Sequence, residues 1–422
     1  MQIRGIDQDR FAASLQESGW DRLWRKLVLQ ALATLQDGQL VIEDPQGTLT
    51  LGEPAADGLR AHLVIEHMAV YRKLMFGGSV GAAEAYMAGA WRTPCLTSVV
   101  RLLARNIEQL NRLDDRWPWL QTVVNRIAHS FNANTLKGSR RNIAAHYDLG
   151  NDFFELFLDQ RMMYSAAVYP SAEATLEEAS WHKCDLICRK LNLQPGDHLL
   201  EIGTGWGGMA IHAAKHYGCR VTTTTLSQEQ LSYAREWVER EGLSDRITLL
   251  HQDYRELEGE FDKLVSVEMI EAVGHEYYET YFRKCASLLK TDGLMLIQAI
   301  TIADQRYEAA RRSVDFIQKY IFPGGGLPSM EVISRCLSRA TDLNLVDLQD
   351  IGGDYARTLA EWRARFHARH AEVRRQGFDE PFCRMWDFYL AYCEGGFRER
   401  TISTVQLVMA KPRAVLPVLP HQ

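Results

Sequence analysis

Residues 199–208, LLEIGTGWGG, place an apolar run, an acid and four glycines in an order that suits the binding of a nucleotide-like ligand. Glu201 closes a predicted strand, and Gly203 and Gly205 follow in a turn that leads into the helix-like run MAIHAAKHYG. Glycines let the backbone approach a ligand closely, and the amino terminus of the next helix presents free N–H groups. The segment therefore predicts a ligand-binding loop at the end of a strand.

The position of the acid indicates a cationic ligand. Dinucleotide-binding folds place their acid about 20 residues after the glycines, at the end of the next strand. Here that region reads VTTTTLSQEQ (221–230), and no acid closes the strand. An acid before the glycines and none after them argues against NAD. The pattern favours S-adenosylmethionine, whose sulfonium and ammonium groups are positively charged.

The composition is that of a soluble globular protein with two domains, or with one large domain and an appendage. The chain has 422 residues, 46% apolar and 24% charged. Its start lacks the apolar core of a signal peptide, and no stretch approaches the ~20 apolar residues that span a bilayer. The eight cysteines are scattered without C-x-x-C pairs. We expect reduced thiols in the core, no metal site and a cytoplasmic protein.

The net charge of −6 is unevenly distributed. Residues 101–141 hold eight basic and three acidic side chains, interleaved with tryptophans, and residues 357–375 hold six basic and two acidic ones. Basic helical stretches with aromatic residues suit an anionic lipid surface, and two solvated helix faces are the alternative. Nucleic acid is not an expected partner, because the chain is acidic and lacks a recognised motif.

The amino-terminal part, residues 1–125, is predicted to be a small α+β accessory domain. LVIED (40–44) and GTLTLG (47–52) flank a turn and form a hairpin, and LRAHLVIE (59–66) supplies a third strand. Helices broken at glycines follow, and a basic linker occupies 126–140. We expect this domain to contact lipid or membrane and to contribute to any homodimer.

Residues 141–422 alternate strands and helices, which predicts a doubly wound α/β domain with a mainly parallel, seven-stranded sheet. Its ligand should lie at the carboxyl ends of the strands. Residues 300–328 are an aromatic and basic insertion ending in Pro-Gly-Gly-Gly, typical of a lid. The predicted strands are 198–202, 219–225, 246–250, 262–268, 293–299, 344–350 and 403–410, with helices at 227–241 and 275–289.

Three further segments carry a family resemblance. They read NIAAHYDLGNDFFELFLDQRMMYSAAVYP (142–170), VSVEMIEAVGHEYYETYF (265–282) and DFIQKYIFPGGGLPS (315–329). With the glycine loop and TLSQEQ (225–230), they resemble the cyclopropane fatty acid synthase family, which includes the mycolic acid methyltransferases. The resemblance spans 140–410 and implies a Rossmann-like class I methyltransferase that uses S-adenosylmethionine. The amino-terminal region resembles the accessory domain of phospholipid-acting members.

The resemblance also assigns residues to the cofactor. It implies a tyrosine–serine pair beside the methionine moiety, a glycine loop, a ribose-binding run and an adenine pocket after strand 246–250. These cofactor-binding candidates, with the acid already singled out, are Tyr164, Ser165, Glu201, Gly203, Gly205, Thr225, Leu226, Ser227, Gln230, Asp253 and Tyr254.

The catalytic positions depart from the family in a pattern. Family cyclopropane synthases hold a bicarbonate base with backbone N–H groups and with Glu, His and Tyr side chains, beside a Cys. This chain retains Glu271 and Tyr320, but it has Ala166 at the Cys position and Gln298 at the His position. Glu268 stands where typical members have glycine. The resemblance therefore implies that a side-chain carboxylate occupies the bicarbonate site, as in the methyl-branching relatives, so that bicarbonate is not required.

The chemistry explains the need for a carboxylate. An alkene that accepts a methyl group becomes a carbocation, which an anion in a dry site stabilises and from which a base removes a proton. Glu268 and Glu271 are three residues apart, so one helical turn would place both on one face. Two such carboxylates should not both ionise, and one pKa should rise. We assign Glu268 as base or cation stabiliser, with Glu271, Tyr320 and Gln298 around it; an exposed acidic turn is the alternative.

Other residues admit structural interpretations. We expect His146 and Asp148 to be structural, in a helix start that covers the cofactor, and His275 to begin a helix. An aromatic set is predicted either to line an acyl tunnel or to fill the core: Phe316, Tyr320, Phe322, Tyr389 and Phe397.

The sequence thus predicts a C-methyltransferase that modifies double bonds in the acyl chains of membrane phospholipids. The product is a cyclopropane, or a methyl or methylene branch. The expected location is the cytoplasm, peripheral to the inner face of an anionic membrane. Two alternatives stay open, namely a methyltransferase of a small soluble acceptor and a non-catalytic lipid-binding relative.

Overall fold

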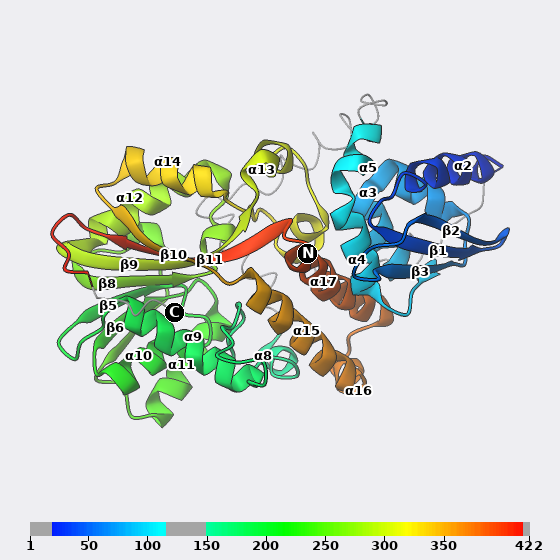
Figure 1. Cartoon of the computed structure of the whole chain (residues 1–422). Helices are drawn as coiled ribbons and strands as arrows, with labels where there is room; N and C mark the ends of the chain where they lie inside the picture. The colour runs from blue at the N-terminus through cyan, green and yellow to red at the C-terminus, as the bar shows by residue number, and fades with distance from the viewer. Residues whose placement is uncertain (1–18, 115–148, 417–422) are drawn as a thin grey trace. The chain divides into compact units, whose positions relative to one another are not determined.

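The computed structural model describes residues 19–114 and 149–416 (Figure 1). The described chain forms two compact units. The first contains 19–114, 312–321 and 362–401, and the second contains 149–311, 322–361 and 402–416.

This division differs from the predicted domain boundaries. The prediction assigned everything after residue 140 to one domain, whereas 312–321 and 362–401 belong to the first unit. The reason is α17 (Glu380–Arg398), a long helix that packs on α3 (Ala69–Met87) and α4 (Leu96–Arg105). The predicted linker, 126–140, lies outside the described residues, and the role of the accessory domain stays a prediction.

The first unit contains a small sheet with strand order β2-β1-β3-β4. β1 (Gly38–Asp44) and β2 (Gly47–Glu53) form the predicted hairpin, and β3 (Arg60–Ile65) runs parallel to β1 as the third strand. The two-residue β4 (Trp91–Arg92) was not predicted. The other helices of this unit are α2 (Asp21–Leu32), α5 (Ile107–Asp114) and α16 (His370–Arg375), with a π-helical turn at Ile317–Ile321.

The predicted helix breaks are confirmed. Gly78 has φ +49° inside α3 and kinks the helix, and Gly89 has φ +72° just after it. Both angles lie in the left-handed region, which glycine adopts without a steric penalty.

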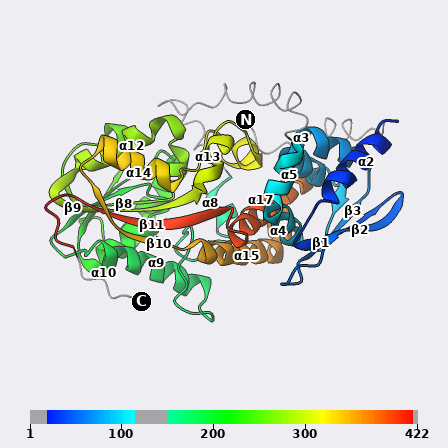
Figure 2. The ribbon, with the colours of Figure 1, turned by 45° about the horizontal axis from the view of Figure 1, so that its top comes forward.

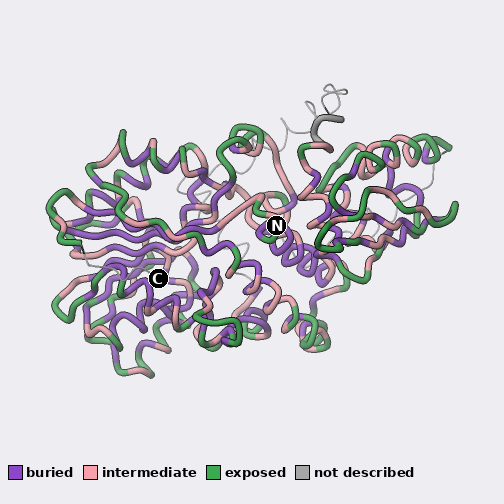
Figure 3. The backbone as a smooth tube through the Cα atoms, viewed as in Figure 1, coloured by how far each residue is buried: buried purple, intermediate pink, exposed green. Residues whose placement is uncertain are grey.

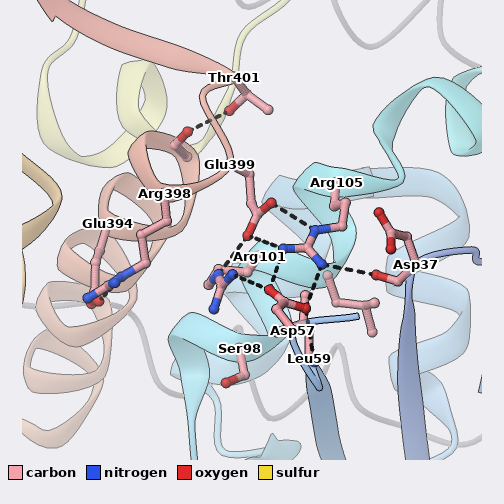
Figure 4. Close-up of polar contacts among 12 residues, drawn as sticks. Asp37, Asp57, Leu59, Ser98, Arg101, Arg105, Glu394, Arg398, Glu399 and Thr401 are labelled. Carbon is pink, nitrogen blue, oxygen red and sulfur yellow. Dashed lines mark hydrogen bonds and ion pairs between the residues drawn. The ribbon is translucent and has the colours of Figure 1, made fainter. Parts of the chain in front are cut away.

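Two arginines of the first basic stretch lie in an ion-pair network within the first unit. Arg101 and Arg105, from α4, both donate to Glu399 at the end of α17 and to Asp57, as Figure 4 shows. Arg105 also donates to the carbonyl oxygen of Asp37. These two cations are therefore neutralised internally, which weakens the expectation that the stretch forms a lipid-binding face.

The second basic stretch also makes internal contacts. Arg357 donates to two backbone carbonyl groups and lies over the ring of Tyr169. Arg363 pairs with the buried Asp387, and Arg369 pairs with Glu372. These three arginines stabilise the fold of their own units.

The second unit is built on a seven-stranded sheet with the order β10-β11-β9-β8-β5-β6-β7. All strands point the same way except β11, which is antiparallel to both of its neighbours. The predicted mainly parallel sheet is confirmed. The strands are β5 (His198–Ile202), β6 (Arg220–Thr224), β7 (Ile247–Leu250), β8 (Phe261–Val267), β9 (Leu289–Ile302), β10 (Asn344–Asp350) and β11 (Ile402–Ala410).

Helices cover both faces of this sheet (Figure 2). α9, α10 and α11 lie on one face, and α12 and α14 lie on the other. The strands are apolar on both faces: Leu199 packs toward α9 and α10, and its neighbour Leu200 packs toward α12 and α14. Figure 3 shows the sheet as the buried centre of the unit. The helices are α8 (Asn151–Phe154), α9 (Leu176–Lys190), α10 (Gly208–Tyr217), α11 (Gln228–Arg240), α12 (Tyr278–Leu288), α13 (Asp304–Ala310) and α14 (Met330–Ala340), with 3₁₀ turns at Tyr254–Glu256, Ile270–Ala272 and His275–Tyr277. α15 (Gly352–Ala368) begins in this unit and ends in the first.

Within residues 19–114 and 149–416, no helix is long and apolar enough to cross a membrane. The same residues contain no group of three or more His, Cys, Asp or Glu side chains arranged to hold a metal ion. The cysteines are free thiols; six of the eight are buried, as expected of core thiols, whereas Cys95 is exposed.

Candidate active site

The glycine loop lies at the carboxyl end of β5, as predicted. The N–H groups of Gly203 and Thr204 donate to the carbonyl oxygen of Thr224 on β6, which anchors the start of the loop. Gly203 has φ +101°, a conformation that side-chain-bearing residues rarely adopt. A Cβ at Gly208, the first residue of α10, would lie 2.7 Å from the carbonyl oxygen of Arg161. Glycine at this point therefore lets α10 begin directly against the chain at 161.

Glu201 is a buried acid at the end of β5. Glu201 is 2% exposed, and its carboxylate accepts a hydrogen bond from the hydroxyl of Thr223 at 2.6 Å. Burial raises the pKa of Glu201 to about 8, with the Thr223 hydrogen bond acting in the opposite direction. A buried acid with this pKa fits a cationic ligand, whose charge would favour the ionised form.

The run after β6 forms a tight polar turn. Thr225 donates to the side chain of Gln230 at 2.9 Å and accepts from the N–H of Ser227, which caps α11. The carbonyl oxygen of Leu226 bonds to His251 at 3.1 Å. This turn follows the carboxyl end of β6, where the ribose of the cofactor is predicted to bind.

Asp253 and Tyr254 follow β7 at the same end of the sheet. Asp253 is buried and accepts hydrogen bonds from the guanidinium group of Arg255, which engages both carboxylate oxygens. Tyr254 packs edge-on against the ring of Tyr281, 5.5 Å away. Their part in an adenine pocket stays a prediction.

Tyr164 and Ser165 lie in a segment without regular secondary structure that precedes α9. The ring of Tyr164 packs on Phe154 at 5.2 Å and near Phe322 at 6.4 Å. The hydroxyl of Ser165 accepts a hydrogen bond from the ammonium group of Lys183 on α9 at 2.7 Å. Sequence reasoning missed Lys183, because a lysine within a helix is normally solvated.

Glu268 comes directly after β8 and has φ +49°. This left-handed conformation is unfavourable for a residue with a side chain and clusters at functional sites. Its Oε1 accepts hydrogen bonds from the N–H of Ala166 and from Gln298, each at 2.8 Å, and its Oε2 accepts one from the hydroxyl of Tyr355 at 2.9 Å. Three donors thus surround the carboxylate and favour its ionised form.

Gln298 is fully buried in β9 and uses both ends of its amide. Its Nε2 donates to Glu268 and to the carbonyl oxygen of Ala166, and its Oε1 accepts from Gln406 on β11 at 3.0 Å. Gln406 therefore fixes the amide so that its donor end faces the carboxylate. The structure brings Gln298 and Glu268 together, and a catalytic role for Gln298 stays a prediction.

Glu271 has the opposite environment. One oxygen accepts a hydrogen bond from the N–H of Ile300, and Oε2 is buried without a partner among the described residues. Burial, followed by repulsion from Glu268, raises the pKa of Glu271 to about 8. Burial also raises the pKa of Glu268, but Gln298 and other donors act against that rise. Because Glu268 accepts three hydrogen bonds and Glu271 accepts one, a single negative charge shared by the pair is more stable on Glu268.

The geometric reason given for this pair was wrong. Glu268 and Glu271 do not share a helical turn, since Glu268 is in the left-handed region and Glu271 lies in the 3₁₀ turn Ile270–Ala272. The sharp turn after β8 brings the two carboxyl groups together instead.

The tyrosine beside the carboxylate is Tyr355, and the prediction had named Tyr320. Tyr320 belongs to the first unit, where its hydroxyl donates to Glu84 at 2.8 Å. Tyr355 lies on α15 in the second unit, is buried and donates to Glu268. A catalytic role for Tyr320 stays a prediction.

His146 and Asp148 lie outside the described residues. His275 begins a 3₁₀ turn that leads into α12, as expected, and its Nδ1 lies 3.2 Å from the hydroxyl of Tyr307. Of the aromatic set, Phe316, Tyr389 and Phe397 are buried in the first unit and Phe322 belongs to the second. An acyl tunnel lined by these residues stays a prediction.

The sequence matches a family model over residues 134–407, that of mycolic acid cyclopropane synthetase. The chain belongs to this family.

Curated relatives extend the similarity to the amino-terminal part. The chain is 38% identical to tuberculostearic acid methyltransferase UfaA1 of Mycobacterium tuberculosis, over 91% of this chain and 90% of the relative. It is 36% identical to the cyclopropane-fatty-acyl-phospholipid synthase of Escherichia coli, over 83% and 88%.

Solved structures support the fold. The mycolic acid cyclopropane synthase CmaA1, in complex with S-adenosylhomocysteine (SAH) and CTAB, is 32% identical, with a TM-score of 0.60 over 64% of this chain and 98% of the other. The chain has a class I methyltransferase fold, and S-adenosylmethionine is its cofactor. At the level of the family, it is a C-methyltransferase of unsaturated lipid chains.

Proposed function

We propose that this enzyme methylates the double bond of an unsaturated acyl chain in a membrane phospholipid, and that Glu268 is the anion of the reaction. The observation that carries the proposal is the carboxylate of Glu268, which is built into the protein and is held by Ala166, Gln298 and Tyr355. The two curated relatives described above, which cover most of this chain, are named for a fatty acid and for fatty-acyl phospholipids.

The residues present fit the cofactor. Glu201 offers a buried carboxylate for a cationic group, and Thr225 and Gln230 offer polar side chains at the ribose position. When bound, S-adenosylmethionine supplies an electrophilic methyl group. As the π electrons of the alkene form the new C–C bond to this group, the bond from sulfur to the methyl carbon breaks. Neutral S-adenosylhomocysteine leaves, and the positive charge passes to the acyl chain as a carbocation.

Glu268 acts on that carbocation. A single charge held in a solvent-poor site stabilises a developing cation without having to reorganise. The carboxylate then accepts a proton. If the proton leaves the added methyl group, its C–H electrons close a cyclopropane ring; if it leaves that methyl group after a hydride shift, a methylene branch forms. A saturated methyl branch needs a hydride from a separate reductant.

Glu271 and Tyr355 keep Glu268 in place and ionised. Glu271 is neutral at pH 7 because its pKa is about 8, so it adds no second charge. The hydroxyl of Tyr355 holds Oε2 at 2.9 Å. With a carboxylate in place, external bicarbonate has no part to play, and we propose that activity does not depend on it.

We further propose that the enzyme works at an anionic membrane surface, peripherally and from the cytoplasmic side, because its substrate is a phospholipid. The first unit contains the region that resembles the accessory domain of phospholipid-acting members. The internal pairing of Arg101 and Arg105 leaves other residues to make the lipid contact.

The test uses S-adenosylmethionine with a trideuterated methyl group, vesicles of unsaturated phospholipid, and mass spectrometry of the fatty acids. A product with two deuterium atoms is a cyclopropane or methylene branch. One with three is a methyl branch whose methyl group was never deprotonated, and a saturated branch of this kind forms only when a hydride donor is added. Each would support the proposal, and chromatography separates the first two. Glu268→Gln should abolish turnover while the Kd for SAH is retained. If the enzyme methylated soluble amines or phenols and did not methylate lipid, the proposal would be contradicted.

A further inference from the structure

Lys183 is a fully buried lysine on α9, next to the Tyr164-Ser165-Ala166 segment. Its relative exposure is 0%, and its ammonium group donates to the hydroxyl of Ser165 at 2.7 Å. Burying an ammonium group is unfavourable unless anions or several acceptors compensate it. A single neutral hydroxyl is a weak compensation, so the charge must be balanced by nearby carboxylates.

Two carboxylates interact with this charge. Lys183 acts to lower the pKa of Asp159 and the pKa of Glu268, in both cases against the dominant effect of burial. Asp159 is 2% exposed and accepts hydrogen bonds from the N–H groups of Arg161 and Met163. Lys183 thus acts electrostatically on both Asp159 and Glu268, while its direct contact is with Ser165.

The link to the carboxylate also runs through the backbone. Ser165, which Lys183 holds, is followed directly by Ala166, whose N–H donates to Glu268 and whose carbonyl oxygen accepts from Gln298. A displacement of Ser165 would therefore change two of the contacts that hold the carboxylate.

We propose that Lys183 is a positioning residue for methyl transfer, which fixes the 164–166 segment against Glu268 and supplies a positive charge that favours the ionised form of this carboxylate. The inference rests on the role proposed for Glu268. The titratable and charged groups that interact with members of this cluster are Asp159, Arg161, Cys184, Glu201, Glu271 and Tyr355.

The test is the pH dependence of kcat in three variants. Lys183→Gln keeps a donor for Ser165 without the charge, Lys183→Met removes both, and Lys183→Arg keeps the charge. Without the charge, the pKa of Glu268 rises, so the acid limb of the profile should move up by about one pH unit in the Gln and Met variants. At pH 7, these variants should lose about tenfold in kcat and regain it at higher pH. The Arg variant should keep the wild-type limb.

Lys190 provides a matched control on the same helix. It is also buried, at 4% exposure, and its ammonium group pairs with Asp347 at 3.1 Å. Lys190 lies about two helical turns along α9 from Lys183. Lys190→Met should lower the Tm and leave the pH profile in place. If Lys183 has only a structural role, its variants should lower kcat equally at every pH and leave the acid limb of the profile where it is in the wild type.

An acid limb at the wild-type pH in soluble Lys183→Gln would overturn the inference; this variant decides the matter if the Met variant does not fold. The proposed function fails separately, through a Glu268→Gln enzyme that turns over like the wild type.

Discussion

The hydroxyl of Tyr355 donates to Oε2 of Glu268 at 2.9 Å. It is the third donor to this carboxylate, after Ala166 and Gln298, which both donate to Oε1. Tyr355 lies in the first turn of α15, and Glu268 lies at the end of β8. A residue that was not predicted therefore holds the residue on which the chemistry depends.

Tyr355→Phe should lower kcat by tenfold to a hundredfold, because a hydrogen bond to a charged group contributes about 1.5–3 kcal/mol. The lost donor also raises the pKa of Glu268, so the acid limb of the kcat profile should move to higher pH. Tyr320→Phe is the comparison. If Tyr320→Phe shows the larger loss and Tyr355→Phe is near wild type, the placement of the tyrosines is wrong.

Glu271→Gln should retain kcat within about tenfold at pH 7, since glutamine mimics the neutral acid that the raised pKa implies. Glu268→Gln should lose far more. Glu271→Gln should also change how the stability of the folded state depends on pH. The folded pKa of about 8 exceeds the ordinary 4.5, so this proton favours the folded state at low pH and its contribution is lost as the pH rises toward 8.

Thermal melts at pH 5.5 and pH 8.5 test that stability effect. The Tm of the wild type should fall more between these values than that of Glu271→Gln. Equal falls in the two proteins would show that Glu271 is ionised in the folded state.

Cofactor binding should release a proton near pH 7. Glu201 is protonated in the free enzyme, with a pKa of about 8, and an ammonium group beside it would favour ionisation. Calorimetry of SAH binding in buffers with different ionisation enthalpies should report up to one proton released. Glu201→Gln should bind more weakly and release less. Heats that are independent of the buffer would contradict the assignment.

Glu399→Gln should destabilise the first unit by about 2–3 kcal/mol, because both Arg101 and Arg105 lose a partly buried anionic partner. Glu372→Gln is the control, since it breaks an exposed pair with Arg369 and should cost about 0–1 kcal/mol. Denaturant unfolding measures both. Equal, small effects would show that the network in Figure 4 contributes little.

The strands could be predicted because each one is signalled by a short apolar run in the sequence itself. The alternation of apolar strands and amphipathic helices placed all seven strands of the large sheet within a few residues, and the acid–glycine order placed the cofactor loop at Glu201 and Gly203. The left-handed turn at Glu268 was not predictable from residue type, since only glycine signals such a conformation in a sequence.

Tyr355 was missed although a signal existed. It follows the strand predicted at 344–350, and that strand runs parallel to β9, so its carboxyl end lies at the same edge of the sheet as Glu268. Tyr320 was chosen from motif similarity alone. Lys183 had no such signal, because its contact with Ser165 depends on how α9 packs.

The most direct test removes the carboxylate and asks whether bicarbonate replaces it. Glu268→Gly should fold, since glycine adopts φ +49° readily, and should leave three donors, from Ala166, Gln298 and Tyr355, facing the gap. Turnover is measured on unsaturated phospholipid vesicles after bicarbonate depletion and after its return. The account predicts that the wild type is unaffected and that the nearly inactive variant is restored by bicarbonate. A depleted wild type that bicarbonate stimulates strongly, or a variant that is fully active without it, would contradict the account.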